Sequence, residues 1–351
     1  MTNPPDVAVA PPKKRLSTII QFVLFLGLGL LIIWLSLRVL TPEEKIQILN
    51  SFRIANYNWV ILTIFLGVIS HVFRSLRWKL LMKPLGYHPS LKNTFYAVMV
   101  GYFANLAFPR LGEVTRCGVL ARYENIPFNK SFGTVITERA VDMICFILLF
   151  ILMILTQMGT ISDYMNDNVY PQLVAKFGNL HFTRIMIYAL IVLALLAVIF
   201  YILIHKKVRK TAFYLKIKNL LHGFWEGLKS LTEMEHPWIF VFYSVVIWTF
   251  YFFMLYICFF CFSETSHVGL GGGLSSLVLG SVGIMITPGG IGLYPAIIQE
   301  TLQLYGVVRT TGLALGWIAW AAQTGMIILI GSISLMLLSF NKKSHGKTGV
   351  A

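Results

Sequence analysis

The chain has little charge and few residues that could support redox or metal chemistry. Of its 351 residues 12% are charged, against about 25% in soluble domains. Two of the four cysteines, Cys258 and Cys261, form a C-F-F-C pattern inside an apolar run, and we interpret them as packing residues because no βαβ context surrounds them. The histidines lack metal-ligand spacing, and no G-x-x-x-x-G-K-[ST] phosphate loop occurs. We therefore expect no metal, no cofactor and no nucleotide-driven step.

The chain also lacks any polar stretch the size of a soluble domain, about 100 residues. Instead 57% of its residues are hydrophobic and its mean hydropathy is +0.74. Several apolar runs exceed about 18 residues, the length that indicates a membrane span. The first run follows a basic tail but is too long for a signal peptide. We predict an all-α polytopic membrane protein with six full spans at 16–38, 57–80, 131–156, 182–204, 237–262 and 312–340.

Two further apolar segments are interrupted, and we interpret each as a re-entrant helical hairpin, at about 93–122 and 270–305. Pro109 and Pro288 break the helices because proline lacks an N–H group, and the glycines beside them permit tight turns. A hairpin at the first segment keeps the cations after Pro109 on the cytoplasmic side, as the positive-inside rule requires. Both chain termini are then expected in the cytoplasm.

This arrangement predicts an inverted-topology repeat, which is frequent in transporters. Each half has the order span, span, hairpin, span, but the halves start on opposite sides of the membrane. The segment 206–236 has helical apolar spacing and many cations, which fits a helix on the cytoplasmic membrane surface or one packed on the protein. The predicted division is a cytoplasmic tail at 1–15, half-repeats at 16–156 and 182–340, an outer loop at 157–181 and a cytoplasmic tail at 341–351.

Charged residues gather beside the first break, where they would lie at membrane depth. Such charges are costly and usually functional. Arg110 and Arg116 suit phosphate binding because a guanidinium offers a planar fork of donors, and Glu113 has the helical spacing to pair with Arg116. Glu138 and Asp142 share one helix face, with Arg139 three residues before Asp142, and we expect these groups to pair with one another or with Arg110 and Arg116.

We expect these groups to line a polar cavity for an anionic head group. The alternative is a closed charge network that locks helices together, which we favour less because a proline–glycine break adjoins it. Arg74 is expected to reach the cavity, whereas Arg77 and Trp78 are interpreted as interfacial anchors. At the second break Tyr294 is expected to offer a hydrogen bond.

Four motifs carry a resemblance to a known family: F-R-S-L-R-W-K-L-L at 73–81, N-L-A-F-P-R-L-G-E-V-T-R at 105–116, E-R-A-V-D at 138–142 and P-G-G-I-G at 288–292. Together they resemble the lysylphosphatidylglycerol synthase transmembrane-region family of flippase-like membrane proteins, over about 57–340. In long bifunctional members, the resemblance implies, a similar membrane domain translocates aminoacylated phosphatidylglycerol and a C-terminal soluble domain synthesises it.

Only residues 341–351 follow the last predicted span, so we expect no transferase domain and no lysyl-transfer activity. Tyr294 lies near the place where many relatives carry an acid. The candidate substrate-binding residues, from the residues and the resemblance together, are Arg74, Asn105, Pro109, Arg110, Gly112, Glu113, Arg116, Glu138, Arg139, Asp142, Pro288, Gly289, Gly290, Gly292 and Tyr294.

The functional hypothesis is a lipid translocase of a bacterial-type cytoplasmic (inner) membrane, not an enzyme, which moves an anionic or phosphate-bearing lipid between leaflets. Its expected partners are membrane lipids, not nucleic acid, because the positive-inside rule accounts for the net charge of +15. One alternative is a membrane enzyme on lipid-linked substrates that uses Glu113, Glu138 and Asp142 as acid, base or metal ligands. The other is a non-transporting partner of a lipid synthase or glycosyltransferase.

Overall fold

The computed structural model describes residues 34, 38, 41–107, 110–164 and 234–345, and within them it is helical and contains no strand. The predicted spans 16–38 and 182–204 lie almost entirely outside these residues, as does most of the segment 206–236. Both predicted cytoplasmic tails also fall largely outside them.

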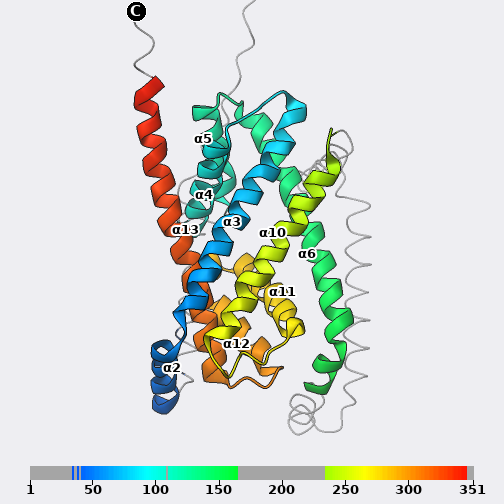
Figure 1. The fold of residues 1–351 in the computed structure, drawn as a ribbon, viewed down its shortest axis with the longest axis vertical. Coiled ribbons are helices and arrows are strands. Elements are labelled where there is room, and N and C mark those ends of the chain that lie inside the picture. Colours follow the sequence, from blue (N-terminus) through cyan, green and yellow to red (C-terminus); the bar gives the residue numbers. More distant parts are fainter. Residues whose placement is uncertain (1–33, 35–37, 39–40, 108–109, 165–233, 346–351) are drawn as a thin grey trace, which may run out of the picture.

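Four long helices form the framework: α3 (Tyr57–Met82), α6 (Phe128–Tyr164), α10 (Pro237–Cys258) and α13 (Arg309–His345). Each contains a stretch long and apolar enough to cross a membrane, which confirms the predicted spans 57–80, 131–156, 237–262 and 312–340 by length and composition. Local signals set two of the starts. Asn56 Oδ1 accepts a hydrogen bond from the Asn58 N–H at 3.1 Å and caps α3, and Pro237 occupies the first turn of α10. Helices α3 and α10 pack side by side (Figure 1).

The first predicted hairpin is a pair of antiparallel helices, α4 (Leu91–Ala107) and α5 (Leu111–Tyr123). Gly101 faces Gly112 so closely that a Cβ at Gly101 would lie 2.9 Å from the Gly112 carbonyl oxygen. Asn105 also lies against Gly112, which fixes the antiparallel register. Arg110 has φ 67° at the break, a left-handed conformation that is uncommon for a non-glycine residue.

The second predicted hairpin has the same form, with α11 (Leu270–Ile286), a 3-10 turn η4 (Pro288–Gly290) and α12 (Leu293–Gln303). The P-G-G-I-G motif makes the turn because Gly289, Gly290 and Gly292 have φ of 60°, 75° and 74°, which glycine adopts without steric cost. Gly280 of α11 lies against Tyr294, where a Cβ would be 2.9 Å from the ring. Both segments are therefore helical hairpins; that they re-enter a membrane stays a prediction.

The two hairpin tips touch each other. A Cβ at Gly289 would lie 3.0 Å from a methyl group of Leu106 at the end of α4. Trp320 of α13 donates its Nε1 proton to the Gly289 carbonyl at 2.7 Å and holds the second tip in place. The turn of the second hairpin thus lies between the end of α4 and α13.

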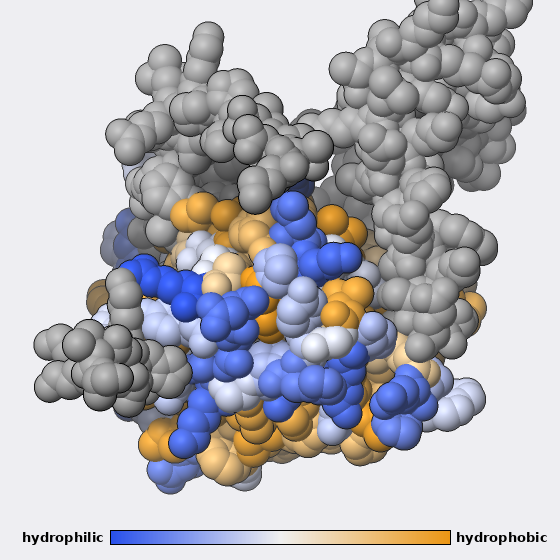
Figure 2. All heavy atoms as spheres, turned by 90° about the horizontal axis from the view of Figure 1, so that it is seen from above, coloured by the Kyte–Doolittle hydropathy of each residue, from blue (hydrophilic) through white to orange (hydrophobic). Residues whose placement is uncertain are grey.

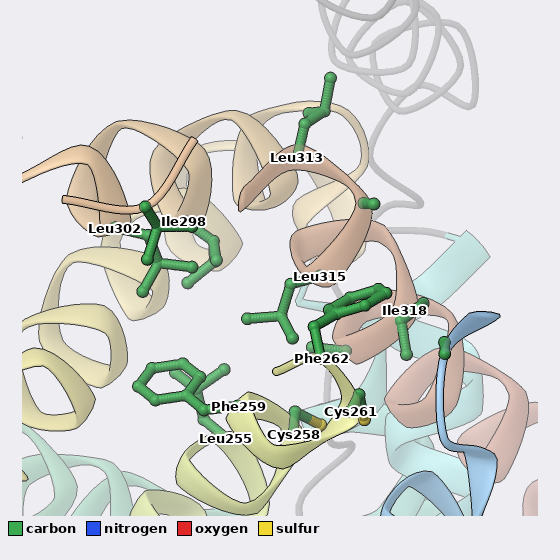
Figure 3. Close-up of a cluster of buried hydrophobic side chains, with 14 of the residues drawn as sticks. Leu255, Cys258, Phe259, Cys261, Phe262, Ile298, Leu302, Leu313, Leu315 and Ile318 are labelled. Atoms are coloured by element: carbon green, nitrogen blue, oxygen red, sulfur yellow. The ribbon is translucent and has the colours of Figure 1, made fainter. Parts of the chain in front are cut away.

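Two apolar cores stabilise the bundle. One joins α3, α4, α5 and α6 around Trp78, Met82 and Leu120. The other joins the ends of α3 and α10, the 3-10 turn η3 (Phe259–Cys261), α12 and α13; Figure 3 shows Ile298, Leu302 and Leu315 within it. Cys258 and Cys261 are free and lie in this second core, as expected for packing residues. The short helix α2 (Pro42–Ile54) packs on α13, and η1 (Lys83–Leu85) extends α3.

One end of the bundle is basic. The C-terminal ends of α3 and α5 and the N-terminal ends of α4 and α6 meet there. Their exposed cations include Lys83, Lys92, Arg122 and Lys130. Figure 2 views this end and shows hydrophilic side chains scattered over an apolar background.

Candidate functional site

Two arginines of α3 meet two carboxylates of α6 inside the bundle. Arg74 Nη1 lies 2.7 Å from Glu138 Oε1 and 2.8 Å from Asp142 Oδ2. Arg77 Nη2 lies 2.6 Å from Asp142 Oδ1 and 3.1 Å from Glu138 Oε1. From α5, Arg116 Nη1 reaches Glu138 Oε2 at 2.9 Å. We call these five residues the arginine–carboxylate network. Arg74 and Arg77 are three residues apart and Glu138 and Asp142 are four apart, so each pair lies on one face of its helix.

The network is almost completely removed from solvent. The side chains of Arg77 and Glu138 are 0% exposed, and that of Asp142 is 12% exposed. Burying a charge is costly unless it is paired and hydrogen-bonded. Helix α10 adds two hydroxyl partners: Tyr251 accepts from Arg74 Nη2 at 3.1 Å, and Ser244 accepts from Arg77 Nη1 at 3.1 Å. The network therefore links α3, α5, α6 and α10.

A second, half-exposed ion pair lies beside the network. Arg139 Nη2 is 3.3 Å from Glu113 Oε1, and its Nη1 is 3.9 Å from Asp142 Oδ2. The predicted Glu113–Arg116 pair is wrong: although both lie on α5, Arg116 points inward to Glu138, and its guanidinium lies 4.6 Å from the ring centroid of Trp78. The network and this pair together hold four guanidinium groups and three carboxylates, and so one excess positive charge.

Arg116 retains donors that no described residue satisfies. Its Nε and Nη2 are buried without a hydrogen-bond partner among the residues that the structure describes. They adjoin a gap of about 10 Å³ lined by Val98, Gly101, Tyr102, Asn105, Gly112, Arg116 and Arg139. That volume is at the lower limit for one water molecule. The polar cavity expected for a head group is therefore closed in this conformation.

At the first hairpin break, the N-terminus of α5 is capped by a side chain of α4. Asn105 Oδ1 accepts a hydrogen bond from the Gly112 N–H at 2.7 Å, which satisfies one free donor at the start of α5. Arg110 is exposed and forms no ion pair with any described residue. The structure therefore separates Arg110 from Arg116, and Pro109 lies outside the described residues.

The second hairpin carries its candidate residues away from the network. Pro288 begins the η4 turn, and Gly289, Gly290 and Gly292 shape it. Tyr294 is 6% exposed and packs into the apolar core; its hydroxyl makes no hydrogen bond within the described part of the chain. At the second tip, Gly289 lies against Leu106 at the end of α4.

Sequence reasoning missed Arg77 as a member of the network. We interpreted Arg77 and Trp78 as interfacial anchors, and this is wrong because both side chains are 0% exposed. Trp78 Nε1 donates to Thr134 Oγ1 at 2.9 Å, so both residues face α6 instead of the membrane surface. The signal available was the match between R-x-x-R on one helix and E-x-x-x-D on another, which predicts paired charges on facing helices.

Metal binding finds no support in the geometry. Within the described ranges, no group of three or more His, Cys, Asp or Glu side chains is placed to hold an ion. His71, near the network, is 3% exposed, and its ring centroid lies 4.6 Å from that of Tyr102.

The chain is similar to proteins of known sequence over most of its length. The family described as the lysylphosphatidylglycerol synthase TM region matches residues 19–331. A UPF0104 membrane protein of Methanocaldococcus jannaschii is 33% identical over 138 residues, which cover 38% of this chain and 39% of the relative. The glycosyltransferase AglD of Haloferax volcanii is 28% identical over 144 residues, which cover 40% of this chain and 22% of the relative.

The chain thus spans less than half the length of either of these curated relatives. No solved structure shows significant similarity to it. The family match covers the helices that carry the network and both hairpins. The chain belongs to the lysylphosphatidylglycerol synthase transmembrane-region family.

Proposed function

We propose that the protein translocates a phosphate-bearing anionic lipid between leaflets, with the head group bound at Arg116 and Arg139. The observation that carries this proposal is the pair of unpartnered, buried donors on Arg116 beside the hairpin break. A planar guanidinium with two free N–H groups matches a phosphate oxygen pair. The one excess positive charge of the site would be neutralised by one phosphodiester.

Binding requires the first hairpin to move. The gap at Arg116 is about 10 Å³, so α5 must separate from α4 or α6 to admit a head group. The moving contacts would be the Gly101–Gly112 approach and the Glu113–Arg139 ion pair, which is half-exposed and so weakly held. The structure is then a closed state, and the deeper network keeps α3 and α6 together.

The proposed orientation places the basic end in the cytoplasm, with the protein in an inner membrane. Support comes from the exposed cations Lys83, Lys92, Arg122 and Lys130 at that end. Both hairpins are proposed to be re-entrant, since their tips meet inside the helix bundle.

Purified protein in liposomes with fluorescent phosphatidylglycerol tests the proposal directly. Lipid in the inner leaflet is protected from a membrane-impermeant quencher, so its movement to the outer leaflet appears as loss of the protected fraction. We expect Arg116→Gln and Arg116→Lys to abolish selective movement, because both lose the planar fork. The matched control is Arg122→Gln, an exposed residue of the same helix, which should transport normally.

Stability is measured in parallel, since Arg116 also neutralises Glu138. Arg116→Lys keeps the charge and should fold. Normal transport by a folded Arg116→Lys variant would contradict the site, and no movement by the unmodified protein would contradict the translocase.

A second candidate is a non-transporting partner of a glycosyltransferase. Its support is the relative named a glycosyltransferase, which matches this chain over 22% of its own length. Co-purification of a glycosyltransferase, together with no lipid movement by the chain alone, would favour this candidate.

A further inference from the structure

A groove lies between α2, the start of α3 and the first half of α13. Helix α2 lies at the end of the bundle opposite the basic end (Figure 1). The volume of the groove is about 640 Å³, within the range of about 300–1,000 Å³ typical of ligand sites. It shares no residue with the arginine–carboxylate network. The lining residues that matter most are Lys45, Phe52, Tyr57, Val60, Trp317 and Ala321.

Two hydrogen bonds hold the groove in shape. The Tyr57 hydroxyl donates to the Phe52 carbonyl at 2.6 Å and fixes the corner between α2 and α3. Thr310 Oγ1 donates to Gln47 Oε1 at 3.3 Å and ties α2 to α13. Because α2 is attached at both sides, the groove is already formed without a ligand.

The groove opens toward an apolar surface. Ile46, Leu49 and Ile54 of α2 are 58%, 63% and 70% exposed, which in a membrane protein indicates contact with lipid. Tyr57 and Trp59 are half-exposed at the start of α3, where aromatic residues mark the boundary between hydrocarbon and water. The groove therefore lies at the depth where lipid acyl chains begin.

Lys45 is the one charged residue among the lining residues. Its side chain is exposed and forms no ion pair with any residue that the structure describes. A cation on a flexible apolar stem at the rim of an apolar groove complements a lipid phosphate above an inserted chain.

We propose that this groove binds a membrane phospholipid, with one acyl chain between α2 and α13 and its phosphate at Lys45. The site is separate from the translocation site proposed above and does not depend on it. Val60 and Ile318 form the buried floor and Trp317 one wall.

Photo-crosslinking in lipid bilayers tests the proposal. The probe is phosphatidylglycerol with a diazirine in one acyl chain, and the labelled residues are mapped by mass spectrometry. We expect enrichment of label at 48–60 and 313–322 over the other apolar helix surfaces. Ala321→Trp should remove this enrichment by filling the groove, while Leu329→Trp, at an exposed position of the same helix, should leave it unchanged.

Lys45→Glu should reduce the enriched labelling several-fold, because it replaces attraction to the phosphate by repulsion. Thermal unfolding of each variant shows whether it is folded; Ala321 is exposed, so the bulky side chain should be tolerated. Uniform labelling of all lipid-facing helices, absence of label because another part of the chain covers the groove, or enrichment that survives in folded Ala321→Trp would each overturn the proposal.

Discussion

At the residue scale, Glu138 is the centre of the site. It accepts from Arg74 and Arg77 through one oxygen and pairs with Arg116 through the other. A single buried carboxylate thus pairs with groups from two other helices, and Asp142 adds a second carboxylate one turn away, which leaves one excess positive charge. The arrangement has features both of a closed charge network and of a binding site for an anionic head group. It locks helices together, yet it leaves donors of Arg116 free.

We expect Glu138→Gln to destabilise the protein strongly. Removing one partner from a buried charge network leaves uncompensated charges and costs about 3–5 kcal/mol. The measurement is thermal or denaturant unfolding of the purified protein in detergent or bilayers.

Glu113→Gln is the matched control, because its ion pair with Arg139 is partly exposed, at 21% and 40%, and exposed pairs contribute about 0–1 kcal/mol. If the two variants were equally stable, Glu138 would not hold the helices together.

At the element scale, each hairpin depends on glycines where two helices approach. In the first hairpin Gly101 and Gly112 bring α4 and α5 into backbone contact, and Asn105 caps α5 from α4. In the second, three glycines with positive φ form the turn. The close packing of α4 on α5 keeps the gap at Arg116 too small for a head group.

We expect Gly112→Ala to destabilise the first hairpin by about 1–3 kcal/mol, the usual cost of overpacking. Its new Cβ would meet the Gly101 carbonyl and the Asn105 amide. Unfolding curves measure the loss of stability. The lipid-movement assay shows whether separating α4 from α5 also opens the site at Arg116.

Gly118→Ala on the same helix is the control, since a Cβ there meets nothing within 4 Å. It should be neutral or slightly stabilising, because alanine favours a helix by about 1 kcal/mol over glycine. Equal destabilisation by both changes would mean that the close approach at Gly112 is unimportant.

At the scale of the whole molecule, the charge distribution defines two ends. Exposed cations gather where α4 begins, whereas α2 and the first turn of α3, with Tyr57 and Trp59, lie at the other end. If the basic end is cytoplasmic, the two hairpin tips meet within the membrane between these ends.

We expect cysteines at Lys92 and Glu43 to react from opposite sides of the membrane. A membrane-impermeant maleimide added to intact cells should label Glu43→Cys and should label Lys92→Cys only after the membrane is permeabilised. The native Cys117, Cys258 and Cys261 are buried and give little background, which the unmodified protein checks. The reverse pattern would invert the proposed orientation, and labelling of both from outside would exclude a spanning arrangement between them.

The hairpin breaks were predictable because they follow from the stereochemistry of single residues such as Gly289 and Gly290. The partners of the charges were predictable only in part. Pairing of the α6 acids with Arg116 was among the expectations, and Glu138 does pair with Arg116, but the partners on α3 were not foreseen. Glu113 has the spacing to pair with Arg116, but the packing of α5 turns Arg116 inward over Trp78, where Glu138 is the nearest carboxylate. Arg77 has the sequence context of an interfacial anchor, and only its position against α6 shows that it is buried.

The sequence by itself determined the membrane class, four of the spans, both helix breaks and the group of residues that carries the charge. These follow from summed hydrophobicity and from local backbone preferences, which need no knowledge of neighbours. The tertiary structure alone decided which arginine meets which carboxylate, that Tyr294 and Arg110 lie apart from the network, that the gap at Arg116 is closed, and that a groove forms beside Lys45. Each of these depends on the rotation and separation of packed helices, which are set by contacts between residues far apart in the chain.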